Sequence, residues 1–223
     1  AWTPGKIVLA DNTLADKDGF TLTTNNPPVA VICGKNVYGA AIGVALHKSP
    51  SGLSWAKDGT KGYTTCFEGI ICTPSISNQN GAALTAAFTG DEDGSDNWDY
   101  ICSTDPEGTA KAAVNYPAFD WVLKYNTRYA AQLGSTRPAW YMPSIAELCQ
   151  VYKNKEAVNE SLLKINGSAS SYADASLGTG WYWSSSQGSY YSENAWLADF
   201  GSGNLYNVYI KSSNSYVCCI AGF

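Results

Sequence analysis

The chain has 223 residues, of which 45% are hydrophobic and only 15% are charged; its 14 Lys and Arg against 19 Asp and Glu leave a net charge of −5. This length is enough to bury one substantial hydrophobic core. Because both would require a basic patch and no run of like charge occurs, nucleic acid and anionic membranes are expected to be poor partners. The longest apolar runs, such as residues 29–33, are far too short to span a bilayer.

Seven cysteines, at positions 33, 66, 72, 102, 149, 218 and 219, accompany a single histidine, His47. Such a cysteine content fits disulfides in an oxidising compartment, but the number is odd and the pairing cannot be read from a sequence. Few lysines and many Tyr, Trp, Ser and Asn are typical of an extracellular protein, and the start at Ala1 without a Met predicts a mature or trimmed form. No Cys-x-x-Cys pair occurs, so we expect neither a zinc site nor a redox site.

Short strands are predicted at the beginning of the chain. Residues 6–10 form an apolar, β-branched run followed by turn residues, and residues 29–33 and 38–46 predict a buried hairpin.

A long segment from 49 to 90 follows, rich in Gly, Ser, Thr and Asn and therefore irregular. Segments of this kind are usually fixed by aromatic anchors or by a disulfide. Trp55 and Phe67 are candidate anchors, and Cys66 and Cys72 could close a small loop.

The most acidic stretch of the chain runs from 91 to 99. Asp91, Asp93 and Asp96 place oxygens at the spacing of a calcium loop, although the twelve-residue pattern lacks its sixth-position Gly and its final Glu. Two interpretations stay open: a calcium site, or a solvated turn that caps the next helix.

That helix is predicted over residues 107–131, with an interruption at Pro117 and an end at Gly134. One apolar face supports it, formed by Ala112, Ala113, Tyr116, Phe119, Leu123 and Tyr129.

Two further helices follow. Ser144 and Glu147 form the capping box that begins the first of them, because the Ser side chain can accept from the third backbone N–H while the Glu side chain reaches back. Its apolar face consists of Ile145, Leu148, Cys149 and Tyr152. The second is predicted over residues 156–165 and is ended by Asn166 and Gly167.

Only strands are predicted after residue 180. Four antiparallel strands are indicated at 181–185, 195–200, 205–211 and 216–220. In the second of them Trp196, Ala198 and Phe200 alternate toward one face, which leaves Leu197 and Asp199 on the other.

The stretch from 181 to 223 divides into an aromatic frame and a polar display. More than half of the residues between 182 and 219 are Ser, Tyr, Asn or Gly, the types that dominate antibody contact loops, although exposed hairpins have the same composition. The predicted frame comprises Trp140, Trp181, Trp183, Trp196, Phe200 and Phe223. The candidate ligand-binding residues are Ser189, Tyr190, Tyr191, Leu197, Asp199, Asn204, Tyr206, Asn207, Tyr209, Ser213 and Ser215.

In the segments 140–148 (WYMPSIAEL), 182–185 (YWSS), 195–200 and 217–223, the chain resembles bacterial C-type-lectin-like domains of the DUF1566 type. The resemblance covers residues 91–223, and residues 7–55 are more loosely similar to the leading strands of such proteins in gut Bacteroidales. It implies an α+β, C-type-lectin-like fold with two to three helices packed on short antiparallel sheets. Residues 1–223 would form one elaborated domain: strands and an irregular segment over 1–90, then a lectin-like core over 91–223 with a binding platform at 181–223.

The resemblance extends to the variable proteins of diversity-generating retroelements, which are surface or pilus-tip adhesins of bacteria or receptor-binding proteins of phages. It implies a non-enzymatic, extracellular adhesin on a cell surface or virion, whose platform binds a protein or glycan on a host, bacterial or phage surface. Pilus or fibre subunits are further partners that it implies. No cofactor is expected, with calcium at the acidic stretch as the exception. Cys149 is the kind of helix residue that would form a disulfide with Cys218 or Cys219, and a vicinal disulfide is the alternative.

Two other functions stay open. The first is a purely structural pilus or tail-fibre module. The second is an oxidase like the formylglycine-generating enzymes, which have a related fold and use a pair of cysteines; here Cys218 and Cys219 are adjacent and would point to opposite faces of a strand, the wrong arrangement for one metal.

Overall fold

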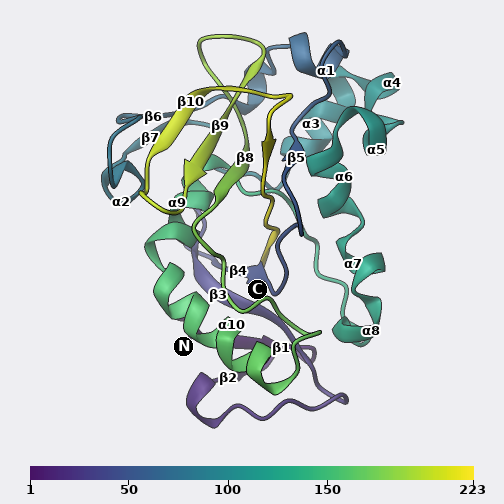
Figure 1. Ribbon diagram of the computed structural model, residues 1–223, viewed down its shortest axis with the longest axis vertical. Helices are drawn as coiled ribbons and strands as arrows, with labels where there is room; N and C mark the ends of the chain where they lie inside the picture. The colour runs from purple at the N-terminus through teal and green to yellow at the C-terminus, as the bar shows by residue number, and fades with distance from the viewer.

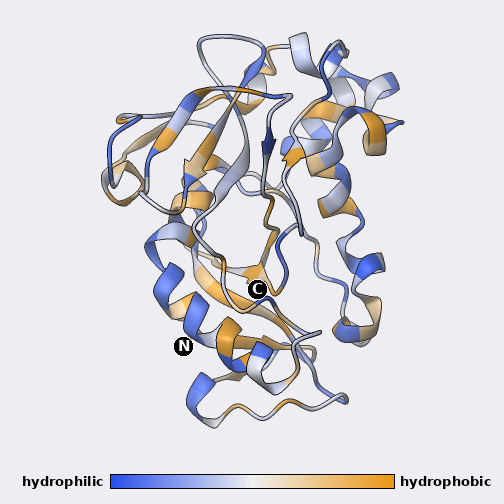
Figure 2. Cartoon of the chain, in the orientation of Figure 1, coloured by the Kyte–Doolittle hydropathy of each residue, from blue (hydrophilic) through white to orange (hydrophobic).

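Apolar and β-branched residues form the central strand of the largest sheet. In the computed structural model, which describes residues 1–223, β3 (Pro28–Lys35) is buried along nearly its whole length and has the hydrophobic colour in Figure 2. Its sheet has the order β12-β4-β3-β1-β2, and every pairing is antiparallel. The other strands of the sheet are β1 (Ile7–Leu9), β2 (Leu14–Ala15), β4 (Ala41–Ala45) and β12 (Ile220–Gly222).

A second, three-stranded sheet contains the aromatic stretch of the C-terminal region. Its order is β10-β9-β8, so β9 is central and β10 forms one edge. The strands are β8 (Trp181–Gln187), β9 (Asn194–Asp199) and β10 (Leu205–Ile210). Two small sheets join the irregular N-terminal segment to itself and to the C-terminal region: β6 (Cys72–Pro74) with β7 (Phe88–Gly90), and β5 (Leu53–Ser54) with β11 (Asn214–Ser215).

The two long helices, α9 (Ile145–Lys153) and α10 (Lys155–Ser168), both pack on β3 (Figure 1). The predicted capping box is confirmed: the Ser144 side chain accepts from the Glu147 N–H, and the Glu147 side chain accepts from the Ser144 N–H. The last helix runs three residues beyond its predicted end at Ile165.

The predicted helix over residues 107–131 is divided into short pieces. They are α4 (Pro106–Thr109), α5 (Ala112–Asn115), α6 (Pro117–Leu123), α7 (Tyr125–Arg128) and α8 (Ala130–Leu133). Pro117 occupies the first turn of α6 instead of a helix interior, because its missing N–H costs nothing there. Leu123, predicted to face the core, is 50% exposed. Gly134 ends the series with a positive φ of 64°.

The remaining helical elements are short and connect the sheets. They are α1 (Lys61–Thr64), α2 (Ala82–Thr85), α3 (Asn97–Thr104) and the 3-10 turns η1 (Lys17–Gly19) and η2 (Glu68–Ile70). No helix combines the length and the apolar character needed to cross a bilayer.

The interior consists of two hydrophobic cores, of 28 and 24 buried residues. The first core lies against α9 and α10 and contains Trp196, Ala198 and Phe200, as the alternation along β9 predicted. The second contains Leu197, which is completely buried, so the prediction that Leu197 faces outward is wrong. Trp55 and Phe67, the predicted anchors of the irregular segment, are fully buried and belong to the second core.

All seven cysteines are free thiols, so the expected disulfides are absent. Cys66 is exposed whereas Cys72 is buried in the first core, which prevents them from closing a loop. Cys218 belongs to the first core and Cys219 to the second, in agreement with the prediction that they face opposite sides. Burial raises the pKa of the Cys149 and Cys218 thiols to about 12.

Truncating a buried tryptophan of β8 should lower the stability of the protein. Trp183 is fully buried and donates its indole N–H to the Leu53 carbonyl at 2.8 Å, so Trp183→Ala should lower the free energy of unfolding by about 3–5 kcal/mol. Tyr191→Ala, at a side chain that is 64% exposed, should change it by less than about 0.5 kcal/mol. Urea unfolding of both variants gives the comparison; equal losses would contradict the division into frame and display.

Candidate binding surface

Tyrosines are exposed at one end of the three-stranded sheet. The loop 188–193 joins β8 to β9 at the top of Figure 1, and in it Tyr190 and Tyr191 are 72% and 64% exposed. The edge strand β10 exposes Val208 and Ile210, and Ile210 pairs with Asn194 where the loop ends. We call loop 188–193 and β10 together the display surface.

Two tyrosines of the display surface form an aromatic group with Trp181 of β8. The ring of Trp181 stacks on Tyr206 with centroids 4.9 Å apart and meets Tyr209 edge-on at 5.0 Å. All three side chains are only half-buried, so each presents part of a ring to solvent. Trp181, predicted as frame, therefore lies among display residues. Rings and hydroxyls of this kind bind by contact area and hydrogen bonds, and they supply no strong base.

A buried glutamine fixes the conformation of the display loop. The Gln187 side chain is fully buried, and its amide oxygen accepts from the Phe67 N–H at 3.3 Å. Its amide nitrogen lies 3.0–3.3 Å from four carbonyl oxygens, those of Gly188, Tyr191 and Ser192 in the loop and that of Asn194 at the start of β9. One side chain thus orders the backbone that carries the exposed tyrosines and joins it to the irregular segment.

A buried lysine fixes the end of β10 in a similar way. Lys211 is completely buried, and its Nζ donates to the carbonyls of Gly62 and Thr65 at 3.1 and 2.8 Å. The rings of Trp55 and Phe67 lie 4.6 and 4.9 Å from the same nitrogen. Because burial disfavours the charged form, the pKa of Lys211 is lowered to about 7.

The structure exposes only part of the predicted display set. Ser189, Tyr190 and Tyr191 are exposed, and a larger group is half-buried: Asp199, Asn204, Tyr206, Tyr209 and Ser213. The Asp199 carboxylate accepts from the Gly201 N–H and the Ser202 hydroxyl, both at 2.7 Å, and so orders a turn.

Asn207 and Ser215 are buried, against the prediction that they face solvent. The backbone of Gly188 lies close to the Asn207 carbonyl, so the display loop covers this part of β10. Ser215 pairs with Leu53 in the β5–β11 ladder, so the irregular segment covers it. Exposed Val208 and Ile210 were missed, because a strand with few polar residues predicts burial.

The acidic segment forms a hydrogen-bonded turn. The Asp91 side chain accepts from the Asp93 N–H at 3.0 Å, and the Asp93 side chain accepts from the Ser95 N–H at 2.9 Å. No three acidic, His or Cys side chains gather in a group that could hold a metal ion. The turn leads into α3, a helix that the sequence did not predict, and the Asp96 side chain makes no capping hydrogen bond there. The expected cap of a helix over residues 107–131 is therefore wrong.

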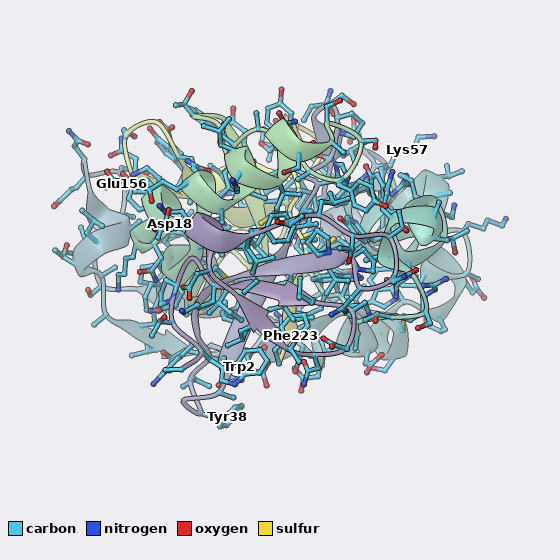
Figure 3. The ribbon with its side chains drawn as sticks, turned by 90° about the horizontal axis from the view of Figure 1, so that it is seen from below. Trp2, Asp18, Tyr38, Lys57, Glu156 and Phe223 are labelled. Carbon is cyan, nitrogen blue, oxygen red and sulfur yellow. The ribbon has the colours of Figure 1, made fainter.

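The largest hollow lies away from the display surface. It has a volume of about 670 Å³ and is lined by Trp2 and Phe223, whose rings stack 6.5 Å apart. Figure 3 shows these two side chains next to each other, with Tyr38 beyond them.

No family model matches the chain, and no curated protein matches it. The structure is similar to the crystal structure of a fimbrial protein from Bacteroides ovatus, with a TM-score of 0.65 and 14% sequence identity over 99% of this chain. The matched region is 49% of that protein, so the chain spans about half its length. The likeness shows a shared fold, in which helices pack on small antiparallel sheets.

The glutamine at the base of the display loop offers a direct test of the loop's order. Gln187→Ala leaves the Phe67 N–H and several loop carbonyls without their partner, and should cost about 1–3 kcal/mol of unfolding free energy. Hydrogen exchange at residues 188–193 should accelerate in this variant. Gln79→Ala, at an exposed glutamine, is the matched control. Unchanged exchange in the loop would show that other contacts order it.

The lysine predicts a pH dependence of stability. The pKa of Lys211 is 10.5 when unfolded and about 7 when folded, so between these values the unfolded state binds more protons and stability rises with pH. From pH 7 to pH 9 the wild type should gain about 2 kcal/mol relative to Lys211→Met. Lys57→Met, at an exposed lysine, should follow the wild type. If urea unfolding gave the same difference in unfolding free energy between wild type and Lys211→Met at pH 7 and at pH 9, the lowered pKa of Lys211 would be refuted.

Proposed function

We propose that this protein is a non-enzymatic, extracellular ligand-binding component of a fimbria, an adhesin whose display surface contacts a protein or glycan. The observation that carries the proposal is a pair of exposed tyrosines, Tyr190 and Tyr191, on a loop that buried Gln187 holds by hydrogen bonds. A loop ordered before binding loses little conformational entropy when it meets a ligand. Tyrosine provides broad contact area with few rotatable bonds.

The cell-surface location is supported by the fold. The Bacteroides ovatus structure with which the chain shares its fold is described as a fimbrial protein. We extend that location to this chain, with other fimbrial subunits as partners. Residues 1–90 contribute side chains to both hydrophobic cores, on which the display surface rests.

We further propose that the domain is a divergent C-type-lectin-like domain of the DUF1566 type and that its display surface is diversified. The capping box at Ser144 and the buried tryptophans Trp183 and Trp196 are the motif positions that support this relationship. Substitutions at Ser189, Tyr190 and Tyr191 would change the surface without disturbing either core, since these side chains are exposed.

A purely structural fimbrial subunit is the second candidate. The shared fold favours it as much as the adhesin, because a subunit that only extends the fibre needs no ligand. The two functions differ in whether the display surface binds a molecule outside the fibre.

The test is a screen of the purified protein on glycan and host-protein arrays. Tyr190→Ala combined with Tyr191→Ala should weaken binding of a detected ligand at least about tenfold, since exposed aromatic anchors concentrate binding energy. Tyr38→Ala removes an equally exposed tyrosine (75%) on the β3–β4 hairpin and should leave binding unchanged. Full ligand binding by the double variant would show that the display surface is not the binding site. If the arrays gave no ligand and the double variant failed to assemble into fibres, the structural subunit would be favoured.

A further inference from the structure

A second, narrower cleft lies between the acidic segment and α6. Its volume is about 180 Å³, and it is the most enclosed hollow of the protein. Four aromatic side chains line it, Trp98, Phe119, Trp140 and Tyr141, and Asp99 is the charged residue of its lining. Trp98 and Phe119 stack with centroids 5.1 Å apart, so the wall they form is rigid. The cleft is separate from the display surface, and nothing said of that surface depends on it.

The size of the cleft sets the kind of group that enters it. A buried apolar cavity of about 150 Å³ holds a single benzene ring, so this cleft has room for one side chain and not for a folded segment or a sugar chain. An aromatic wall accepts either an apolar group or a cation, because ring faces carry negative partial charge.

Charge decides between these two. Residues 91–99 include five carboxylates, and no Lys or Arg occurs between Lys61 and Lys111. None of the ion pairs of the protein involves this segment. Burial, together with the neighbouring carboxylates of Asp96 and Asp93, raises the pKa of Asp91 to about 6. Of these carboxylates Asp99 lines the cleft, and no Lys or Arg does, whereas Glu92 lines a different hollow together with Lys35 and Lys153. The charge of the cleft itself is therefore negative.

We propose that this cleft receives the cationic side chain of a lysine or arginine presented by a partner protein. The aliphatic stem would lie against Phe119 and Trp98, and the charged end would meet the ring faces and the free carboxylate of Asp99. Cation–π contact favours a cation over an apolar group of the same shape, and a carboxylate in the lining adds selectivity for positive charge. A bare metal ion is a poor occupant, because it requires several oxygens that converge on one point.

The experiment is a nuclear magnetic resonance titration of the whole chain with two capped tripeptides, acetyl-Gly-Lys-Gly-amide and its norleucine analogue. The lysine peptide should shift the indole N–H signals of Trp98 and Trp140 and saturate at millimolar concentration, and the norleucine peptide should bind at least threefold more weakly. Asp99→Asn should remove this preference for lysine. Asp58→Asn, which neutralises an exposed carboxylate outside the cleft, should retain it.

Three outcomes would overturn the proposal. Equal binding of both peptides would show an apolar pocket without charge recognition. Shifts of the same indole signals by calcium chloride but not by the lysine peptide would assign the segment to a metal ion. Contacts this weak become detectable at a peptide concentration of about 1 mM. If the signals of Trp98 and Trp140 did not shift up to 20-fold that concentration, the cleft would have no ligand of this class.

Discussion

The last eight residues of the chain are the element on which both cores depend. Tyr216 accepts from the Trp183 N–H at 3.0 Å, and Cys219 accepts from the Ala45 N–H at 2.9 Å, so this segment lies between the three-stranded sheet and the five-stranded sheet. Its final strand β12 pairs with β4 on one side and bonds to Tyr141 on the other. Because successive side chains point to opposite faces, Cys218 enters the first core and Cys219 the second.

The conformation of the display surface depends on buried polar side chains as well as on apolar packing. Gln187 and Lys211 each direct their nitrogen at backbone carbonyls in a water-poor interior, where an unpaired carbonyl is costly. Such contacts are specific in direction, so they define one conformation of the loop and of the end of β10. A surface composed of Ser, Tyr and Asn can then vary while the backbone beneath it stays the same.

Sequence patterns of a few residues correctly predicted those features that depend only on residues close together in the chain. The capping box at Ser144, the two long helices, and the alternation of Trp196, Ala198 and Phe200 are all present. Periodicity also predicted an outward Leu197, and failed because alternation identifies two faces of a strand without saying that a distant segment covers the second one.

The sequence could not predict contacts between residues far apart in the chain. His47 and Asp174 form a contact of 3.1 Å between ring nitrogen and carboxylate, 127 positions apart, and no local pattern joins them. Lys211 looked like an ordinary strand lysine, and Gln187 like one more polar residue of a hairpin. Fully buried long polar side chains are rare, so a sequence reader assigns them to the surface. The interruption predicted at Pro117 is present, but the further breaks of this helix, where the backbone leaves helical angles at Lys111 and Tyr129, were not predicted.

The free thiols make the chain its own reporter of unfolding. Cys66 is the exposed cysteine, whereas burial raises the pKa of Cys33 and Cys219 and keeps them as unreactive thiols within the two cores. An alkylating reagent should therefore modify the native protein first at Cys66 and reach the buried positions only when a core opens. Because Cys218 and Cys219 belong to different cores, mass spectrometry of the labelled peptide could show whether the two cores open together or one at a time.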